Sequence, residues 1–319
     1  MSYQPDIAVL IPCYNEGAAI APVVAAFRRS LPAARIYVYD NNSSDDTQAQ
    51  ARAVGAIVRS ESRQGKGNVV CRMFADIDAD VYVLVDGDGT YDAAQAPQLV
   101  AKLLSGPFDM VNGRRVETAQ KNYRPGHRLG NALLTGLVAA VFSRQFTDML
   151  SGFKLFSRRY VKSFPAQSQG FEIETQLTVH ALQMGMAVAE VDTLYSDRME
   201  GSTSKLSTWK DGFRILKTIV RLVKNERPFE FFGGIAALLA LAAAVLFSPI
   251  LVGYLQTGLV PRFPTLIVAT GLGISALLSL LTGLLLEAVT LAKRETRRLS
   301  YLAIPAFYGE QALKQERSQ

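Results

Sequence analysis

Two long apolar segments near the C-terminus constrain the fold more than any other feature of the sequence. They lie at about 231–255 and 265–291, and neither contains a charged residue before Glu287. Each is longer than the roughly twenty apolar residues that a helix needs to cross a bilayer. Basic residues flank the pair on both sides, whereas the short connection carries only Arg262. By the positive-inside rule we expect two membrane spans with both chain termini in the cytosol; buried helices of a large soluble domain are the alternative.

The N-terminal third alternates short strand-like runs with amphipathic helical stretches. The runs lie at 6–12, 34–40, 56–60, 80–86 and 108–113 and are rich in Val, Ile and Tyr, and helical spacing marks 18–31, 44–54 and 67–77. This alternation predicts an α/β fold, a mostly parallel sheet covered by helices. The Asn/Ser/Asp cluster at 41–46 predicts an N-cap with acidic residues in the first turn of the next helix.

These patterns divide the chain into four parts. We expect a cytosolic α/β domain at 1–207, a basic amphipathic juxtamembrane helix at 208–229, two transmembrane helices within 230–292 and a cytosolic tail at 293–319. An apolar stretch of about fourteen residues after Arg128 is too short to span a membrane and is either a core helix or an interfacial one.

The net charge of +6 fits an anionic lipid, a phosphorylated substrate or nucleic acid. Because the cations alternate with apolar residues and not with an aromatic stacking platform, we expect no nucleic-acid partner. Cys13 and Cys71 are too few for a disulfide framework, and we expect both to be reduced core residues.

Polar residues collect where the predicted strands end, which is where ligands of parallel sheets bind. These residues are Tyr14, Asn15, Glu16, Asp40, Asp86 and Asp88. Asp86 and Asp88 are two positions apart, so on an extended backbone they point to the same side. Oxygen ligands of this kind suit Mg²⁺ or Mn²⁺, which bind substrate phosphates. A solvated turn is the alternative for an isolated D-x-D, but its position after a buried strand favours a cation site.

Six ordered motifs together resemble the family 2 glycosyltransferases with the GT-A fold. They are IPCYNE, VYDNNSSDDT, RQGKGN, DGDGTYD, NGRR and DMLSGFKLFSRR. With YSDRMEGSTSKLSTWKDG and the two apolar segments, the chain is similar to the dolichol-phosphate mannosyltransferase-like branch, whose members move a sugar from a nucleotide onto a polyprenyl phosphate. The motifs cover about 6–224, and the remainder is similar by hydropathy alone.

The resemblance implies an inverting, Mg²⁺- or Mn²⁺-dependent glycosyltransferase at the inner (plasma) membrane. Its donor would be a nucleotide-diphosphate sugar, with a UDP-sugar favoured over GDP-mannose, and its acceptor an undecaprenyl- or dolichyl-type polyprenyl phosphate. The lipid-linked product would serve cell-envelope glycan or glycoprotein modification, and a homo-oligomer is left open. The rivals are a processive polysaccharide synthase, whose Q-x-x-R-W motif is missing around the single Trp209, and a non-catalytic membrane scaffold, which would be expected to have lost the D-x-D acids.

The resemblance also implies roles for individual residues. The residues expected to bind the nucleotide are Pro12, Tyr14, Asn15, Glu16, Asp40, Lys66 and Asp86. The residues expected to bind the metal are Asp86 and Asp88. Mannosyltransferases often have a Gln after the second Asp as a further metal contact, but here Gly89 and Thr90 follow. Asp92 is therefore a candidate third ligand. The phosphate and lipid-phosphate contacts are Arg114, Arg128, Arg198 and Lys205.

Asp88, Asp148 and Arg198 are the expected catalytic residues, and Glu172 or Glu174 is expected on the sugar and acceptor side unless these two acids only cap a helix. Asp148 resembles the family's candidate base. However, a phosphate monoester has its second pKa near 6 and attacks without a general base. On that account Asp148 orients a basic residue or the sugar.

Overall fold

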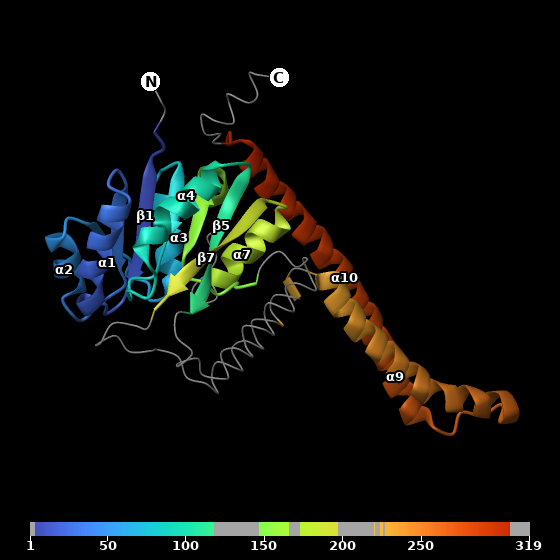
Figure 1. The fold of residues 1–319 in the computed structure, drawn as a ribbon. Helices are drawn as coiled ribbons and strands as arrows, with labels where there is room; N and C mark the ends of the chain where they lie inside the picture. The colour runs from blue at the N-terminus through green and yellow to red at the C-terminus, as the bar shows by residue number, and fades with distance from the viewer. Residues whose placement is uncertain are drawn as a thin grey trace, which may run out of the picture. The chain divides into compact units, whose positions relative to one another are not determined.

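The structure is a computed structural model that describes residues 4–117, 147–165, 173–196, 220, 224–225 and 227–306. The chain divides into two compact units, one of Met1–Gly212 with Arg297–Gln319 and one of Phe213–Thr296 (Figure 1). The apolar stretch after Arg128 and most of the predicted 208–229 helix lie outside the described residues.

A seven-stranded sheet forms the centre of the first unit, in the order β3-β2-β1-β4-β6-β5-β7. Only β6 runs antiparallel to its neighbours, so the predicted mostly parallel sheet is confirmed. Each of the five predicted runs forms a strand, whereas the sequence patterns did not identify β6 and β7. The strands are β1 (Ile7–Cys13), β2 (Arg35–Asp40), β3 (Ile57–Ser60), β4 (Val81–Leu84), β5 (Phe108–Glu117), β6 (Lys154–Ser157) and β7 (Ala187–Tyr195).

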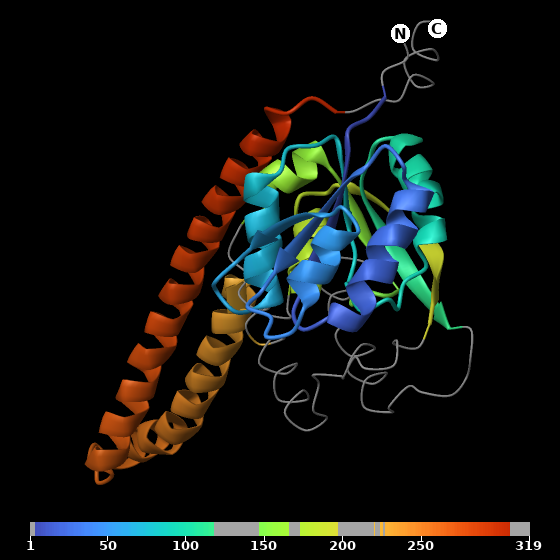
Figure 2. The ribbon, with the colours of Figure 1, turned by 90° about the vertical axis from the view of Figure 1, so that its left-hand side faces the viewer.

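Helices cover both faces of this sheet (Figure 2). They are α1 (Gly17–Ser30), α2 (Thr47–Ala53), α3 (Lys66–Asp76), the short 3₁₀ helix η1 (Ala93–Gln95), α4 (Ala96–Leu104), α6 (Arg158–Ser163) and α7 (Ile173–Gln183). The predicted acidic first turn of α2 is wrong, because the helix begins after the acids. Asp46 is its N-cap, and that side chain accepts from Gln50 instead of capping the backbone.

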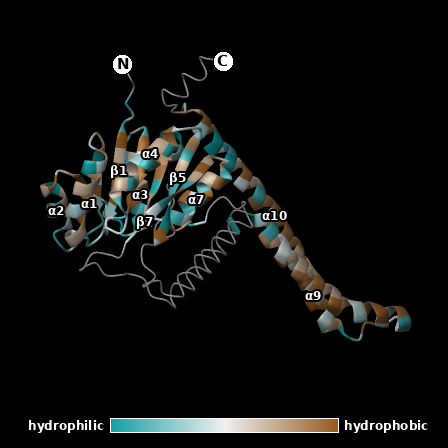
Figure 3. Cartoon of the chain, in the orientation of Figure 1, coloured by the Kyte–Doolittle hydropathy of each residue, from teal (hydrophilic) through white to brown (hydrophobic). Residues whose placement is uncertain are grey.

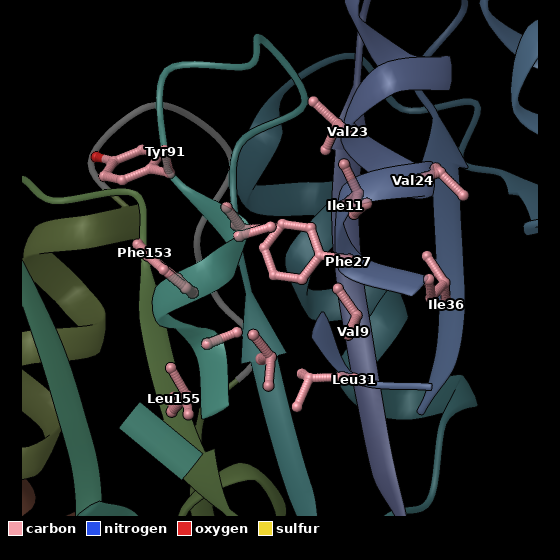
Figure 4. Close-up of a cluster of buried hydrophobic side chains, with 14 of the residues drawn as sticks. Val9, Ile11, Val23, Val24, Phe27, Leu31, Ile36, Tyr91, Phe153 and Leu155 are labelled. Carbon is pink, nitrogen blue, oxygen red and sulfur yellow. The ribbon is translucent and has the colours of Figure 1, made fainter. Parts of the chain in front are cut away.

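Alternate residues of the strands face opposite layers, which creates a core on each side. On the α1 side, Phe27 packs among Val9, Ile11 and Phe153, and its ring centroid lies 6.0 Å from that of Phe153 in an edge-to-face arrangement (Figure 4). On the other side, Phe74 of α3 makes edge contacts with aromatic rings of β4, β6 and the end of α6. Both cysteines are buried and free, as predicted.

The second unit contains α9 (Pro228–Thr257) and most of α10 (Phe263–Leu302). Both helices are long and apolar enough to cross a membrane, with a mean hydropathy of 2.6 and 2.0 over their most apolar windows (Figure 3). Only 11% of each window is buried, which argues against the alternative of core helices. The two helices approach each other where Ser279 Oγ donates to the Phe232 carbonyl at 2.9 Å. The predicted segments lie inside these helices.

Candidate active site

The expected nucleotide- and metal-binding residues gather at the carboxyl ends of β1, β2 and β4. Because β1 pairs in parallel with β2 on one side and with β4 on the other, these three strands end at the same edge. The chain order reverses between β1 and β4, and ligands of open α/β sheets bind at such a switch point. Pro12 lies next to the end of β1, opposite Tyr39 of β2.

The loop after β1 is tied to the loop after β2 by side-chain hydrogen bonds. Asn15 adopts a left-handed φ of 53°, and its backbone N–H donates to Ser43 Oγ at 2.9 Å. In return, its Oδ1 accepts from the Ser44 N–H at 2.8 Å. The Glu16 N–H donates to Thr47 Oγ1 at 2.9 Å. The two loops therefore form one preorganised surface, on which Tyr14 is 37% exposed.

Asp40, the last residue of β2, has a buried oxygen that accepts no hydrogen bond from any described residue. Its Oδ2 accepts from Gln48 Nε2 at 2.8 Å and from the Ser43 N–H at 3.2 Å. Its Oδ1 is buried, and no donor reaches it in the part of the chain that the structure describes. A buried acceptor without a donor costs about 1–3 kcal/mol, so this oxygen is suited to a ligand N–H group.

Asp86 and Asp88 lie just beyond β4, in different surroundings. Asp88 is buried, and its Oδ1 accepts from the hydroxyl of Thr90 at 2.7 Å. Asp86 is more accessible, with 30% of its side chain exposed. Gly152 makes room for it, because a Cβ at that position would lie 2.2 Å from Asp86 Oδ2.

These two carboxylates fit a cation that takes its other ligands from water and phosphate, as Mg²⁺ and Mn²⁺ do. Among the described residues, no group of three or more His, Cys, Asp or Glu side chains could hold a metal ion by itself. Asp92 accepts from the Ala94 N–H at 2.9 Å at the start of η1. Its role as a third ligand remains a prediction.

Lys66 joins the predicted nucleotide site to the predicted acceptor side. Its Nζ lies 2.5 Å from Asp86 Oδ1 and also contacts Glu174 Oε1. Burial lowers the pKa of Lys66, but the two carboxylates outweigh that effect and raise the pKa above its ordinary value. The lysine is therefore charged at neutral pH.

Arg115 binds both carboxylate oxygens of Asp148. Its Nε and Nη2 each lie 2.7 Å from one of these oxygens, and its backbone N–H donates to Oδ2 at 3.2 Å. Burial raises the pKa of Asp148, but the hydrogen bonds and charge of Arg115 lower it below its ordinary value overall. Such a carboxylate is a weak base. Sequence reasoning missed Arg115, although it adjoins Arg114 in the NGRR motif.

A buried polar network supports this ion pair, and the sequence reasoning missed its members as well. Asn112 Nδ2 donates to the Asp148 carbonyl at 2.7 Å and to Glu190 Oε1 at 2.8 Å. Glu190 Oε2 accepts from the Thr147 N–H at 2.9 Å, and Lys154 Nζ donates to Asn112 Oδ1 at 2.6 Å. Burial lowers the pKa of Lys154 to about 8. The sequence signals were the positions of Asn112 within the NGRR motif and of Lys154 within the DMLSGFKLFSRR motif.

The expected phosphate-binding cations are not brought together in the described part of the chain. Arg114 lies on β5 and forms a bidentate ion pair with Asp192 of β7, at 2.6 and 2.7 Å. Arg128, Glu172, Arg198 and Lys205 lie outside the described residues. The roles expected for all five remain predictions.

Comparisons with known proteins agree on one family. The model of glycosyl transferase family 2 matches residues 8–164. Glycosyltransferase AglJ of Haloferax volcanii is 34% identical over 238 residues, which cover 72% of this chain and 77% of AglJ. The dolichyl-phosphate hexose transferase of the same organism is 27% identical over 222 residues, which cover 70% of this chain and 96% of that protein.

The fold also matches a solved structure of glucosyl-3-phosphoglycerate synthase from Mycobacterium tuberculosis in complex with Mn²⁺, uridine-diphosphate and phosphoglyceric acid. The TM-score is 0.58 at 24% identity, covering 69% of this chain and 78% of the other. This likeness shows that the first unit has a GT-A-like fold. Together with the identity to AglJ over most of that protein's length, the family match gives one conclusion: the chain belongs to glycosyl transferase family 2.

Proposed function

We propose that this glycosyltransferase moves a sugar from a UDP-sugar onto a polyprenyl phosphate in the membrane, with inversion at the anomeric carbon. The observation that carries the proposal is that a family 2 glycosyltransferase unit continues into two helices, each long and apolar enough to cross a membrane. A polyprenyl tail cannot leave the bilayer without exposing apolar surface to water. A membrane-anchored active site reaches such an acceptor where it lies.

The choice of uridine rests on Asp40. Uracil presents one N–H group on its pairing edge, whereas guanine presents an N1–H and an amino group side by side. Gln48 and Ser43 already donate to one oxygen of Asp40, and among the described residues none donates to the other, buried oxygen. One acceptor matches the single uracil N–H, and the related Mycobacterium structure contains uridine-diphosphate.

Asp86 and Asp88 are the residues that would hold Mg²⁺ or Mn²⁺. The bound cation would supply positive charge that stabilises the departing nucleoside diphosphate. The related Mycobacterium structure contains Mn²⁺. In this chain, Thr90 orients the Asp88 carboxylate and Gly152 leaves space around that of Asp86.

The lipid phosphate needs no protein base. A phosphate monoester is mostly dianionic at neutral pH, because its second pKa is near 6. Asp148 is therefore available to hold Arg115, and this ion pair adds a fixed guanidinium to the catalytic edge. Arg114, Arg128, Arg198 and Lys205 would offset the charge of the donor diphosphate and of the lipid phosphate, and Arg198 would act in catalysis. A dolichyl-phosphate enzyme among the relatives supports this acceptor class.

The proposed topology follows from the basic flanks of the two spans. The catalytic unit and both termini lie in the cytosol, where nucleotide sugars are made, and the short connection between α9 and α10 lies outside. The basic 208–229 segment would bind the anionic surface of the inner membrane.

The test is a transfer assay with membranes that contain the protein. They are incubated with polyprenyl phosphate and a panel of radiolabelled UDP- and GDP-sugars, with Mg²⁺, Mn²⁺ or EDTA. We expect label in the lipid fraction from a UDP-sugar, only when a metal is present, and none with the Asp88→Asn variant. A parallel arm offers phosphoglyceric acid as a soluble acceptor. Absence of lipid-linked product with every donor would refute the proposal.

A further inference from the structure

Lys66 bridges two parts of the catalytic edge that are distant in sequence. It is the first residue of α3, and its ammonium group contacts Asp86 beyond β4 and Glu174 in the first turn of α7. These partners are 20 and 108 residues away along the chain. The bridge therefore exists only in the folded protein, and it connects the carboxylate proposed to bind the cation to a different helix.

The two halves of the bridge differ in exposure. The side chains of Lys66 and Glu174 are 14% and 10% exposed, whereas that of Asp86 is 30% exposed. Separating a buried ion pair leaves an uncompensated charge and is costly. The more exposed contact with Asp86 is screened by water and exchanges more readily. The geometry therefore makes Glu174 the fixed partner and Asp86 the exchangeable one.

A donor and its cation would change both sides of this balance. The bridge contains one ammonium and two carboxylates, so it carries one net negative charge. Lys66 would be repelled from Asp86 if that carboxylate held a divalent cation, because the ammonium and the cation are both positive. A diphosphate offers that same ammonium new anionic acceptors, and lysine binds phosphate well as a point charge. The cation would thus compete with Lys66 for Asp86, and the diphosphate would replace Asp86 as the anionic partner of Lys66.

We propose that Glu174 is a positioning residue that holds Lys66 while the Lys66 ammonium exchanges Asp86 for the diphosphate of the donor. Glu174 acts through Lys66 and does not touch the reacting atoms. The inference rests on the proposed function, since it assumes a metal-bound nucleoside diphosphate as the ligand.

The experiment is a double-mutant cycle on the full-length protein in detergent. The dissociation constant of UDP at saturating Mn²⁺ is measured by calorimetry for the wild type, Glu174→Gln, Lys66→Met and the double variant. We expect Glu174→Gln to weaken UDP binding about tenfold in the wild-type background, the scale of one charge-assisted hydrogen bond. In the Lys66→Met background we expect Glu174→Gln to weaken UDP binding less than about twofold. Glu174 acts through Lys66, and the effects of coupled residues are not additive.

A second readout uses Mn²⁺ alone, followed by electron paramagnetic resonance. Lys66→Met binds Mn²⁺ more tightly than the wild type, because Asp86 has lost its internal counter-ion, yet it binds UDP·Mn²⁺ more weakly. If Lys66 stayed bound to Asp86 when the donor binds, Lys66→Met would not change the affinities for Mn²⁺ and for UDP·Mn²⁺ in opposite directions. Asp109→Asn is the matched control, since it removes a buried carboxylate from its ion pair with Arg159 at the opposite end of β5. We expect it to leave both dissociation constants unchanged.

Equal losses of UDP affinity from Glu174→Gln in both backgrounds would overturn the inference, as would no loss in the wild-type background. If Glu174→Gln does not fold, Glu174→Asp in the same cycle tests the same coupling. Binding and transfer are measured separately, so the two proposals fail differently. A cycle with the expected coupling but no lipid-linked product would overturn the proposed function alone, and a wild type that binds neither Mn²⁺ nor UDP would overturn both.

Discussion

Replacement of Asp148 by Asn separates an orienting role from a general-base role. The carboxylate and the Arg115 guanidinium form a bidentate pair in which their side chains are only 9% and 16% exposed. Removing one partner of a buried pair costs about 3–5 kcal/mol of unfolding free energy. We expect about 3 kcal/mol, at the low end of that range, because the Asn carbonyl still accepts one bond from Arg115.

The expected effect of Asp148→Asn on turnover is smaller than the loss of a general base would produce. Removing a base that takes a proton in the transition state typically lowers the rate by about 10²–10⁴-fold. If Asp148 only orients Arg115, we expect kcat to fall by about tenfold or less on that scale. Asp88→Asn, which removes one of the two proposed cation ligands, should cost far more. Radiolabel transfer to polyprenyl phosphate gives kcat and KM, and calorimetry gives the UDP affinity.

Two controls make the comparison decisive. Chemical unfolding of both variants shows that the assays were run on folded protein. The pH dependence of stability checks the ion pair itself, since the folded-state pKa of Asp148 is lowered. The stabilisation of the folded protein by Asp148 is therefore fully present above the pKa of Asp in the unfolded chain, near 3.9. It is lost as the pH falls through the lower pKa of Asp148 in the folded protein. Equal losses of turnover from Asp88→Asn and Asp148→Asn, with donor binding unchanged, would refute the no-base mechanism.

Three further predictions concern the same unit. Gly152→Ala should weaken Mn²⁺ and UDP·Mn²⁺ binding at least about tenfold, because its Cβ would lie 2.2 Å from Asp86 Oδ2. Gly106→Ala is the control, since its Cβ would lie at an ordinary 3.4 Å from its nearest neighbour. Burial lowers the pKa of Lys154 in the folded protein to about 8 from 10.5, so between these pH values the unfolded chain binds more protons than the folded one. The unfolding free energy of the wild type should therefore rise by about 3 kcal/mol from pH 8 to 10.5, at 1.36 kcal/mol per pKa unit. Lys154→Met should abolish this rise. Asp40→Asn should weaken UDP binding about tenfold and leave binding of Mn²⁺ alone unchanged, and equal affinity for UDP in the wild type and this variant would remove Asp40 from the base site.

The features that could be predicted from the sequence are those encoded over short distances. The apolar runs that form β1 to β5 and the uncharged segments inside α9 and α10 follow from periodicity and length, which neighbouring residues define. The placement of Asp40, Asp86 and Asp88 at one edge also follows, because parallel strands end together. The acidic first turn expected for α2 was wrong because the helix begins only at Thr47. The preceding Asp45 accepts from the Thr47 N–H nearby and from the Gly17 N–H, which is distant in sequence.

The remaining features depend on pairings between residues that are far apart along the chain. The four-residue strand β6 enters the sheet antiparallel between β4 and β5, and no local pattern specifies that position. Which arginine of the NGRR motif faces Asp148 depends on the strand face, since neighbouring residues of β5 point in opposite directions. Arg115 meets Asp148, and Arg114 meets Asp192.

The D-x-D motif illustrates the same division within one site. Its residue types and its place after a buried strand were enough to predict a cation site, because they depend only on chemistry and local geometry. That Asp86 shares Lys66 with Glu174, and that Gly152 leaves space for its carboxylate, required β4, α3, α7 and the segment before β6 to pack together. Long-range packing of this kind is specified by the whole core and not by any single stretch of sequence.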